Sequence, residues 1–113
     1  MPKLPPAARL ELIQAVLAAF DNDVRLLLLG HLFEAGSGGL RTSELARRVG
    51  RGQDHVRKHL IVLEQALLVQ NQVGRDEGGL FSRYVMTDHG ESWFERLGLR
   101  EGNRAVPLLA LRA

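Results

Sequence analysis

The side chains best suited to chemistry in this 113-residue chain are cationic and lie close together in the sequence. Between Arg41 and Leu60 there are six Arg and Lys side chains and two acidic ones, a net charge of +4, whereas the whole chain carries only +2. Cationic charge concentrated on one short segment suits a polyanion, and DNA is the usual polyanion for such a segment. The charge pattern therefore predicts a DNA-binding segment.

Two helices joined by a Gly-containing turn are expected to carry this charge. The first begins at Thr42 or Ser43, either of which can cap it, and ends at Gly50. The second begins near Gln53 and spans about residues 53–68. Its apolar residues recur at helical spacing and predict a face that packs on a core. They are Val56, Leu60, Leu63 and Leu67.

The opposite face of the second helix carries side chains that can bind DNA. Arg and Lys suit phosphate oxygens and guanine, and Gln suits adenine. A solvated surface helix with no partner is the alternative interpretation. The candidate DNA-binding residues of the two helices are Thr42, Ser43, Arg51, Gln53, Asp54, His55, Arg57, Lys58 and His59.

A hairpin is predicted directly after the second helix. Val69–Val73 alternates apolar and polar residues, residues 74–79 (GRDEGG) are typical of a turn, and Leu80–Thr87 is rich in aromatic and β-branched residues. Arg75 at the tip and Arg83 on the return strand are candidates for contact with the phosphate backbone or a minor groove. Because two acidic residues follow Arg75, a solvated loop is the alternative.

The order helix, turn, helix, hairpin resembles a small winged helix-turn-helix transcriptional regulator of the ArsR/MarR type. The resemblance covers about residues 21–90 and is closest to the ArsR pattern. The residues that carry it are Asp21 to Leu29 for an Asp-x-x-Arg-Leu phrase, then Leu45-Ala46, Gly50, Gln53, Val56, His59-Leu60, Leu63 and Leu68-Val69, and finally Tyr84 to Gly90 for a MarR-like Tyr-x-Leu-Thr-x-x-Gly phrase.

The resemblance implies an α+β, mainly α fold with a two-stranded wing and additional N- and C-terminal helices. It implies sequence-specific binding of double-stranded DNA by a transcriptional regulator, with repression as the expected mode of action. Helix 53–68 would contact the major groove, and wing 74–83 the backbone or minor groove. A winged helix used for protein–protein contacts, or an architectural DNA-binding module, is the alternative.

Three residues depart from the family pattern. Leu67 occupies the place of a Gly near the end of the second helix, so we expect that helix to run on or to end without a positive-φ cap. Ile61 occupies a position that is usually polar, and Gly52 replaces a capping Ser or Thr.

The histidines permit a metal site but do not favour one. His55 and His59 have the i, i+4 spacing of a helical metal site, but the resemblance gives them a structural or DNA-contacting role. Asp88 and Glu91 around His89 are better explained as the N-cap and capping-box partner of a further helix. We therefore expect no metal and no cofactor. His31, within an apolar helix, is predicted to be a packed core residue.

The composition predicts one domain over residues 1–113, with 1–20 and 88–113 as dimerisation helices and tail. Ala7–Phe20 and the helix 89–99 carry apolar residues outside the helix-turn-helix, and the apolar tail 105–111 needs a surface to pack on. A homodimer is the expected assembly. The chain has no cysteine, no signal peptide, no run of ~20 apolar residues and no catalytic constellation. We expect a cytoplasmic protein that is not an enzyme, and the sequence does not identify a small-molecule effector.

Overall fold

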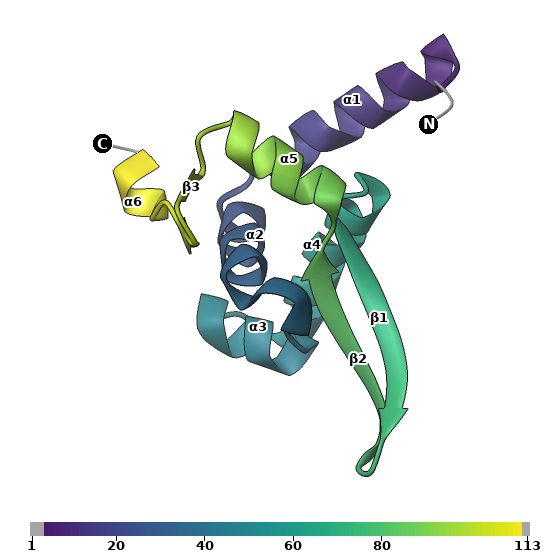
Figure 1. Ribbon diagram of the computed structural model, residues 1–113, viewed down its shortest axis with the longest axis vertical. Helices are drawn as coiled ribbons and strands as arrows, with labels where there is room; N and C mark the ends of the chain where they lie inside the picture. Colours follow the sequence, from purple (N-terminus) through teal and green to yellow (C-terminus); the bar gives the residue numbers. More distant parts are fainter. Residues whose placement is uncertain (1–3, 112–113) are drawn as a thin grey trace.

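The computed structural model describes residues 4–111 as a helical body from which a long β-hairpin extends (Figure 1). Figure 1 also shows α1 projecting from the body and the C-terminal segment lying beside α2. The elements in chain order are α1 (Pro6–Phe20), α2 (Asp23–Ala35), the 3₁₀ turn η1 (Gly36–Gly38), α3 (Thr42–Val49), α4 (Gln53–Gln65), β1 (Val69–Asp76), β2 (Gly79–Met86), α5 (Asp88–Arg96), β3 (Arg100–Glu101), β4 (Arg104–Ala105) and α6 (Leu108–Leu111).

Leucines and valines from α1, α2, α3, α4 and the turn before β1 make the centre of the core. The predicted stripe of α4 is fully buried as far as Leu63, whereas Leu67 is 55% exposed and Leu68 is buried instead. The prediction that Leu67 packs in the core was therefore wrong. The largest fully buried side chains are Val16, Leu28, Leu29, Leu32, Leu45, Val56, Leu60, Leu63 and Leu68.

The hairpin β1–β2 is antiparallel and paired from Val69↔Met86 to Asp76↔Gly79. The predicted turn over residues 74–79 was too long, since only residues 77 and 78 lie between the strands. At its base the hairpin is joined to the chain before α3, where Leu40 and Tyr84 exchange two backbone hydrogen bonds of 3.0 and 2.8 Å. These two bonds attach the base of the hairpin to the body.

Thr87 connects the hairpin to α5 and to the end of α4. Its hydroxyl donates to the carbonyl oxygen of Leu67 (2.6 Å) and accepts from the Gly90 N–H (3.0 Å), so Thr87 is the N-cap of α5. The prediction that Asp88 caps this helix was wrong, and Asp88 and Glu91 lie in its first turn. A Cβ on Gly90 would lie 2.3 Å from the Leu68 carbonyl oxygen, so this close packing requires glycine.

The helix α4 ends three residues earlier than the predicted 53–68. The Leu68 N–H donates to the Leu63 carbonyl (3.0 Å) and the Leu67 N–H to the Glu64 carbonyl (2.9 Å), the paired bonds of a Schellman motif. This motif places its C′ residue in the left-handed region, and Leu67 has φ 61°. The expectation that the helix runs on, or ends without a positive-φ residue, was therefore wrong.

We expect Leu67→Gly to stabilise the protein by about 1 kcal/mol. Left-handed backbone costs a residue with a Cβ about 1–2 kcal/mol, and the greater freedom of glycine in the unfolded chain offsets part of this gain. Helices α3 and α5 already have Gly50 and Gly98 at the equivalent position, each with φ 68°. Thermal unfolding should show a Tm higher by about 4–8 °C. Leu67→Ala retains the Cβ and should leave Tm nearly unchanged. A Gly variant that melts no higher than the wild type would contradict backbone strain at Leu67.

The C-terminal segment folds back on α2. The Ala105 N–H donates to the Glu34 carboxylate (3.0 Å), and a Cβ built on Gly30 would lie 3.2 Å from the Ala105 Cβ. The apolar tail predicted to need a surface packs here, although Leu109 is 81% exposed. The prediction of one helix over 89–99 was wrong at its end, because α5 stops at Arg96 and the small hairpin β3–β4 follows. Residues 1–3 and 112–113 of the predicted domain lie outside the described residues.

Candidate nucleic-acid interface

The exposed face of α4 carries most of the predicted DNA-binding residues. The helix begins at Gln53, and its N-cap residue Gly52 supplies no side-chain hydrogen bond. Its apolar stripe faces the core, so the side chains between the apolar positions face solvent. The structure thereby brings five predicted residues together on one exposed helical turn and a half. They are Gln53, Asp54, His55, Arg57 and Lys58.

Arg57 is bound to its own helix in the free protein. Its guanidinium donates to the Asp54 carboxylate (3.0 Å) and to the Gln53 side-chain oxygen (3.4 Å). The Arg57–Asp54 pair is exposed, with 54% and 95% of the two side chains accessible, so it contributes little to stability. Neither Arg51 nor Lys58, both exposed, forms an ion pair with any residue in 4–111.

His59 faces inward and is only partly exposed, unlike the other candidates on α4. Arg25 of α2 donates to His59 Nδ1 (3.1 Å), and His59 Nε2 lies 3.2 Å from His55 Nε2. Arg25 is itself held by the carbonyl oxygens of Ala18 (2.7 Å) and Ala19 (3.0 Å) at the end of α1. Arg25 belongs to the Asp-x-x-Arg-Leu motif of the family resemblance and His59 to its His-Leu motif, so two motifs that are separate in the sequence are in direct contact.

Burial, Arg25 and His55 all lower the pKa of His59 below its ordinary value of 6.5. Burial and Arg48 likewise lower the pKa of His31, against a smaller opposing effect of Glu34. His31 is half-buried and lines a cavity of about 240 Å³ between α2 and the C-terminal segment, so it is not the packed core residue that the sequence predicted. Both histidines are neutral at pH 7.

We expect the free energy of unfolding to decrease as the pH falls below about 6.5. Both pKa values are lower in the folded state than the unfolded value of 6.5, so below that pH the unfolded chain binds more protons. The stability is fully present above pH 6.5 and is lost toward the folded pKa. Urea unfolding at several pH values measures it, and His31→Gln should reduce the slope. A stability that stays constant or rises on acidification would contradict the shifts.

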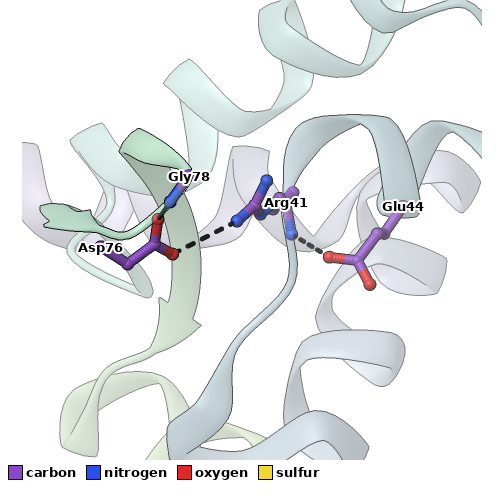
Figure 2. A network of polar contacts seen from close by, with 4 residues as sticks. All are labelled: Arg41, Glu44, Asp76 and Gly78. Atoms are coloured by element: carbon purple, nitrogen blue, oxygen red, sulfur yellow. Dashed lines mark hydrogen bonds and ion pairs between the residues drawn. The ribbon is translucent and has the colours of Figure 1, made fainter.

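Arg41 at the start of α3 was missing from the predicted site residues. Its N–H donates to the Glu44 carboxylate (3.0 Å), and Arg41 is the N-cap residue, so the predicted caps Thr42 and Ser43 lie in the first turn instead. Ser43 is exposed and Thr42 half-buried at this helix N-terminus. Figure 2 shows the Arg41 guanidinium directed toward Asp76 of the hairpin, away from Glu44.

The contact between Arg41 and Asp76 joins α3 to the tip of the hairpin. The two charged groups are 4.0 Å apart, and Asp76 also accepts from the Gly78 N–H (2.9 Å), which closes the turn (Figure 2). Asp76 is one of the two acidic residues that favoured a solvated loop in the sequence, and here it is paired with a cation. Only the charge of Arg41 was visible from the sequence, because its partner is distant along the chain.

The two arginines of the hairpin lie on opposite faces. Arg75 is paired with Leu80 and Arg83 with Gln72, and side chains alternate between faces along each strand. Arg75 is exposed near the tip, whereas the guanidinium of Arg83 lies 4.9 Å from the centre of the Phe81 ring. Arg75 and Arg83 therefore cannot both contact DNA that lies against one face of the hairpin.

Comparison with solved structures gives several matches to this arrangement. NolR from Sinorhizobium fredii is 27% identical, with a TM-score of 0.62, over 87% of this chain and 94% of that one. The winged helix-turn-helix domain of Mb0332 from Mycobacterium bovis is 21% identical, with a TM-score of 0.66, over 87% of each chain. MepR from S. aureus is 19% identical, with a TM-score of 0.64, over 81% of this chain and 73% of that one.

The chain is a winged helix. The fold class expected from the sequence is confirmed, with α3 and α4 as the helix-turn-helix of this winged helix and β1–β2 as its wing. No protein-family model and no curated protein matches the sequence. Among the described helices of the winged helix, none is long and apolar enough to cross a membrane.

Proposed function

We propose that this winged helix is a sequence-specific, double-stranded DNA-binding transcriptional regulator that acts as a repressor in the cytoplasm. The observation that carries the proposal is the exposed face of α4, where Gln53, Arg57 and Lys58 lie together with no core function. Two compared structures add support: MepR was solved as a complex with DNA, and BigR from Xylella fastidiosa, 24% identical with a TM-score of 0.57, is described as a transcriptional repressor.

In this proposal α4 contacts base edges and the wing contacts the backbone. An α-helix fits the major groove, where Arg bonds to guanine and Gln to adenine. Lys58, Arg51 and the exposed Arg75 suit phosphate oxygens. Arg57 must first leave Asp54, so its bond to a base replaces an intramolecular bond rather than one to water alone.

We further propose that the regulator is a homodimer formed through α1. This helix has two apolar faces: Val16 and Ala19 are buried in the core, whereas Leu10, Ile13 and Leu17 are 55%, 50% and 65% exposed. The second face lies on the helix that projects from the body in Figure 1. An exposed apolar stripe of this kind indicates an interaction surface. Mb0332 is described as homodimeric, and a two-fold dimer would present two copies of α4 to one DNA face.

Selection of duplexes from a random pool, followed by binding measurements on two variants, tests the function. Arg57→Ala should cost about 1–3 kcal/mol on the selected duplex and relax the preference at one base pair. Arg75→Ala, which removes a phosphate contact, should weaken all duplexes alike.

Three results would contradict parts of this proposal. An Arg57→Ala variant with unchanged affinity and preference would remove α4 as the base-contacting helix. Equal affinity for selected and random duplexes would indicate an architectural DNA-binding module. Absence of binding to any duplex at low salt would leave a winged helix that contacts proteins.

A further inference from the structure

Three side chains from two helices form a hydrogen-bonded chain that ends on the exposed face of α4. Arg25 is fixed by the carbonyl oxygens of Ala18 and Ala19, and its Nη1 lies 3.1 Å from His59 Nδ1. His59 Nε2 lies 3.2 Å from His55 Nε2. The two imidazole rings meet edge to face, with centroids 4.7 Å apart.

The direction of every hydrogen bond in this chain follows from its first member. A guanidinium can only donate, so His59 Nδ1 must accept, and the proton of neutral His59 is then on Nε2. That proton is donated to His55 Nε2, which must accept in turn, and the proton of neutral His55 is then on Nδ1. Free imidazole side chains prefer the other tautomer, with the proton on Nε2, so His55 is held in the less common form.

We propose that Arg25, acting through His59, fixes His55 as a hydrogen-bond donor on the DNA-facing surface of α4. Arg25 and His59 are positioning residues, and the Nδ1–H of His55 is the group that contacts DNA. This assignment rests on the proposed function for its DNA partner, whereas the tautomer of His55 is a property of the free protein. Among residues 4–111, none accepts a hydrogen bond from His55 Nδ1, so this donor is available.

A donor of fixed polarity selects among the groups that DNA presents. Phosphate oxygens and the N7 and O6 atoms of purines accept hydrogen bonds, whereas the amino groups of adenine and cytosine only donate in the major groove. His55 is therefore matched to a phosphate, to a purine N7 or O6, or to the O4 atom of thymine. A histidine free to exchange tautomers would accept from an amino group equally well, so the preference depends on Arg25.

The same hydrogen bonds argue against a metal on the i, i+4 histidine pair. The separation of 3.2 Å between the two Nε2 atoms suits a shared metal ion, but a ligating nitrogen needs its lone pair. His59 Nε2 carries a proton as long as Nδ1 accepts from Arg25. Metal binding would therefore require the loss of the Arg25 contact. Burial lowers the pKa of His59, which keeps the ring neutral and its Nδ1 able to accept from Arg25.

Long-range ¹H–¹⁵N NMR correlation on the free protein at pH 7.5 tests the polarity. We expect the Nδ1–H pattern for His55 and the Nε2–H pattern for His59. In Arg25→Met the His55 pattern should return to Nε2–H, and Arg25→Lys, which retains a donor, should largely preserve Nδ1–H. The backbone amide spectrum of each variant reports whether the fold is intact. A wild-type His55 protonated on Nε2 overturns the proposal without recourse to any variant.

Binding to a duplex recovered from the random pool tests the DNA contact. His55→Ala should weaken binding by about tenfold for each half-site, the contribution of one good hydrogen bond. His55→Asn should retain most of the affinity, because its amide places a donor close to the position of Nδ1. Equal affinity of wild type and His55→Ala overturns the contact. If no duplex binds at all, the proposed function fails, whereas the tautomers of the free protein are still measured independently.

Discussion

Raising the salt concentration from about 50 mM to about 200 mM is expected to weaken DNA binding by about a thousandfold. Arg51, Lys58 and Arg75 are exposed and form no ion pair with any described residue, so they are available for phosphate. In a dimer they would neutralise about six phosphates, and each lowers the logarithmic salt slope by about 0.9. Binding titrations at four or five salt concentrations give this slope directly.

Lys58→Gln provides the matched test of this slope. The variant removes one cation from each protomer, so the slope should become shallower by about 2 units for a dimer. Arg96→Gln removes the same charge from the last turn of α5, outside the helix-turn-helix and the wing, and should leave the slope unchanged. A slope near zero for the wild type would contradict electrostatic binding to DNA, and equal changes in both variants would contradict the placement of the interface on α4.

Replacing Leu10, Ile13 and Leu17 with Glu is expected to convert the dimer to a monomer and to reduce DNA affinity by about a hundredfold or more. These side chains are largely exposed, so the charges remove an intermolecular apolar contact and leave the buried face of α1 intact. A monomer would then bind only one half-site, and its affinity would no longer be raised by a second, linked protomer at the other half-site. Light scattering at micromolar concentration measures the mass, and binding to the selected duplex measures the affinity.

The control for this triple variant adds the same charge to a third face of α1. Ala7, Gln14 and Ala18 are exposed and lie about 100° around the helix from the apolar stripe. Their replacement by Glu should leave the mass unchanged. A wild-type protein that is monomeric by light scattering and still binds its duplex tightly would contradict the dimer and leave the fold as described.

The helical part of the fold and the hairpin could be predicted from local patterns. The spacing of Val56, Leu60 and Leu63 requires one buried face on α4, and Gly50 marks the end of α3 because a left-handed C-cap favours glycine. The same logic misplaced the end of α4. At Leu67 the residue type argues against left-handed backbone, and the Schellman hydrogen bonds with the Thr87 contact outweigh that preference.

The candidate site could be predicted only where the side chains share one helix. The outward residues of α4 follow from helical spacing, but Arg41 and Arg25 act through partners that are distant in the sequence, Asp76 and His59. The sequence also placed Arg75 and Arg83 together on the wing, and the register of the strands separates them. The short hairpin β3–β4 was missed because two-residue strands contain too few residues for an alternating pattern.

The left-handed turn at Leu67 has a consequence for the length of DNA that one protomer covers. The Schellman bonds fix the direction in which the chain leaves α4. Thr87 follows β2, and its hydroxyl donates to the Leu67 carbonyl, so the end of β2 is held at the end of α4. The angle between α4 and the wing is therefore set by these bonds together with the Leu40–Tyr84 backbone pair, and none of them involves α1. The footprint of a single protomer is an intrinsic property of residues 40–87, whereas the separation of two footprints depends on how α1 pairs.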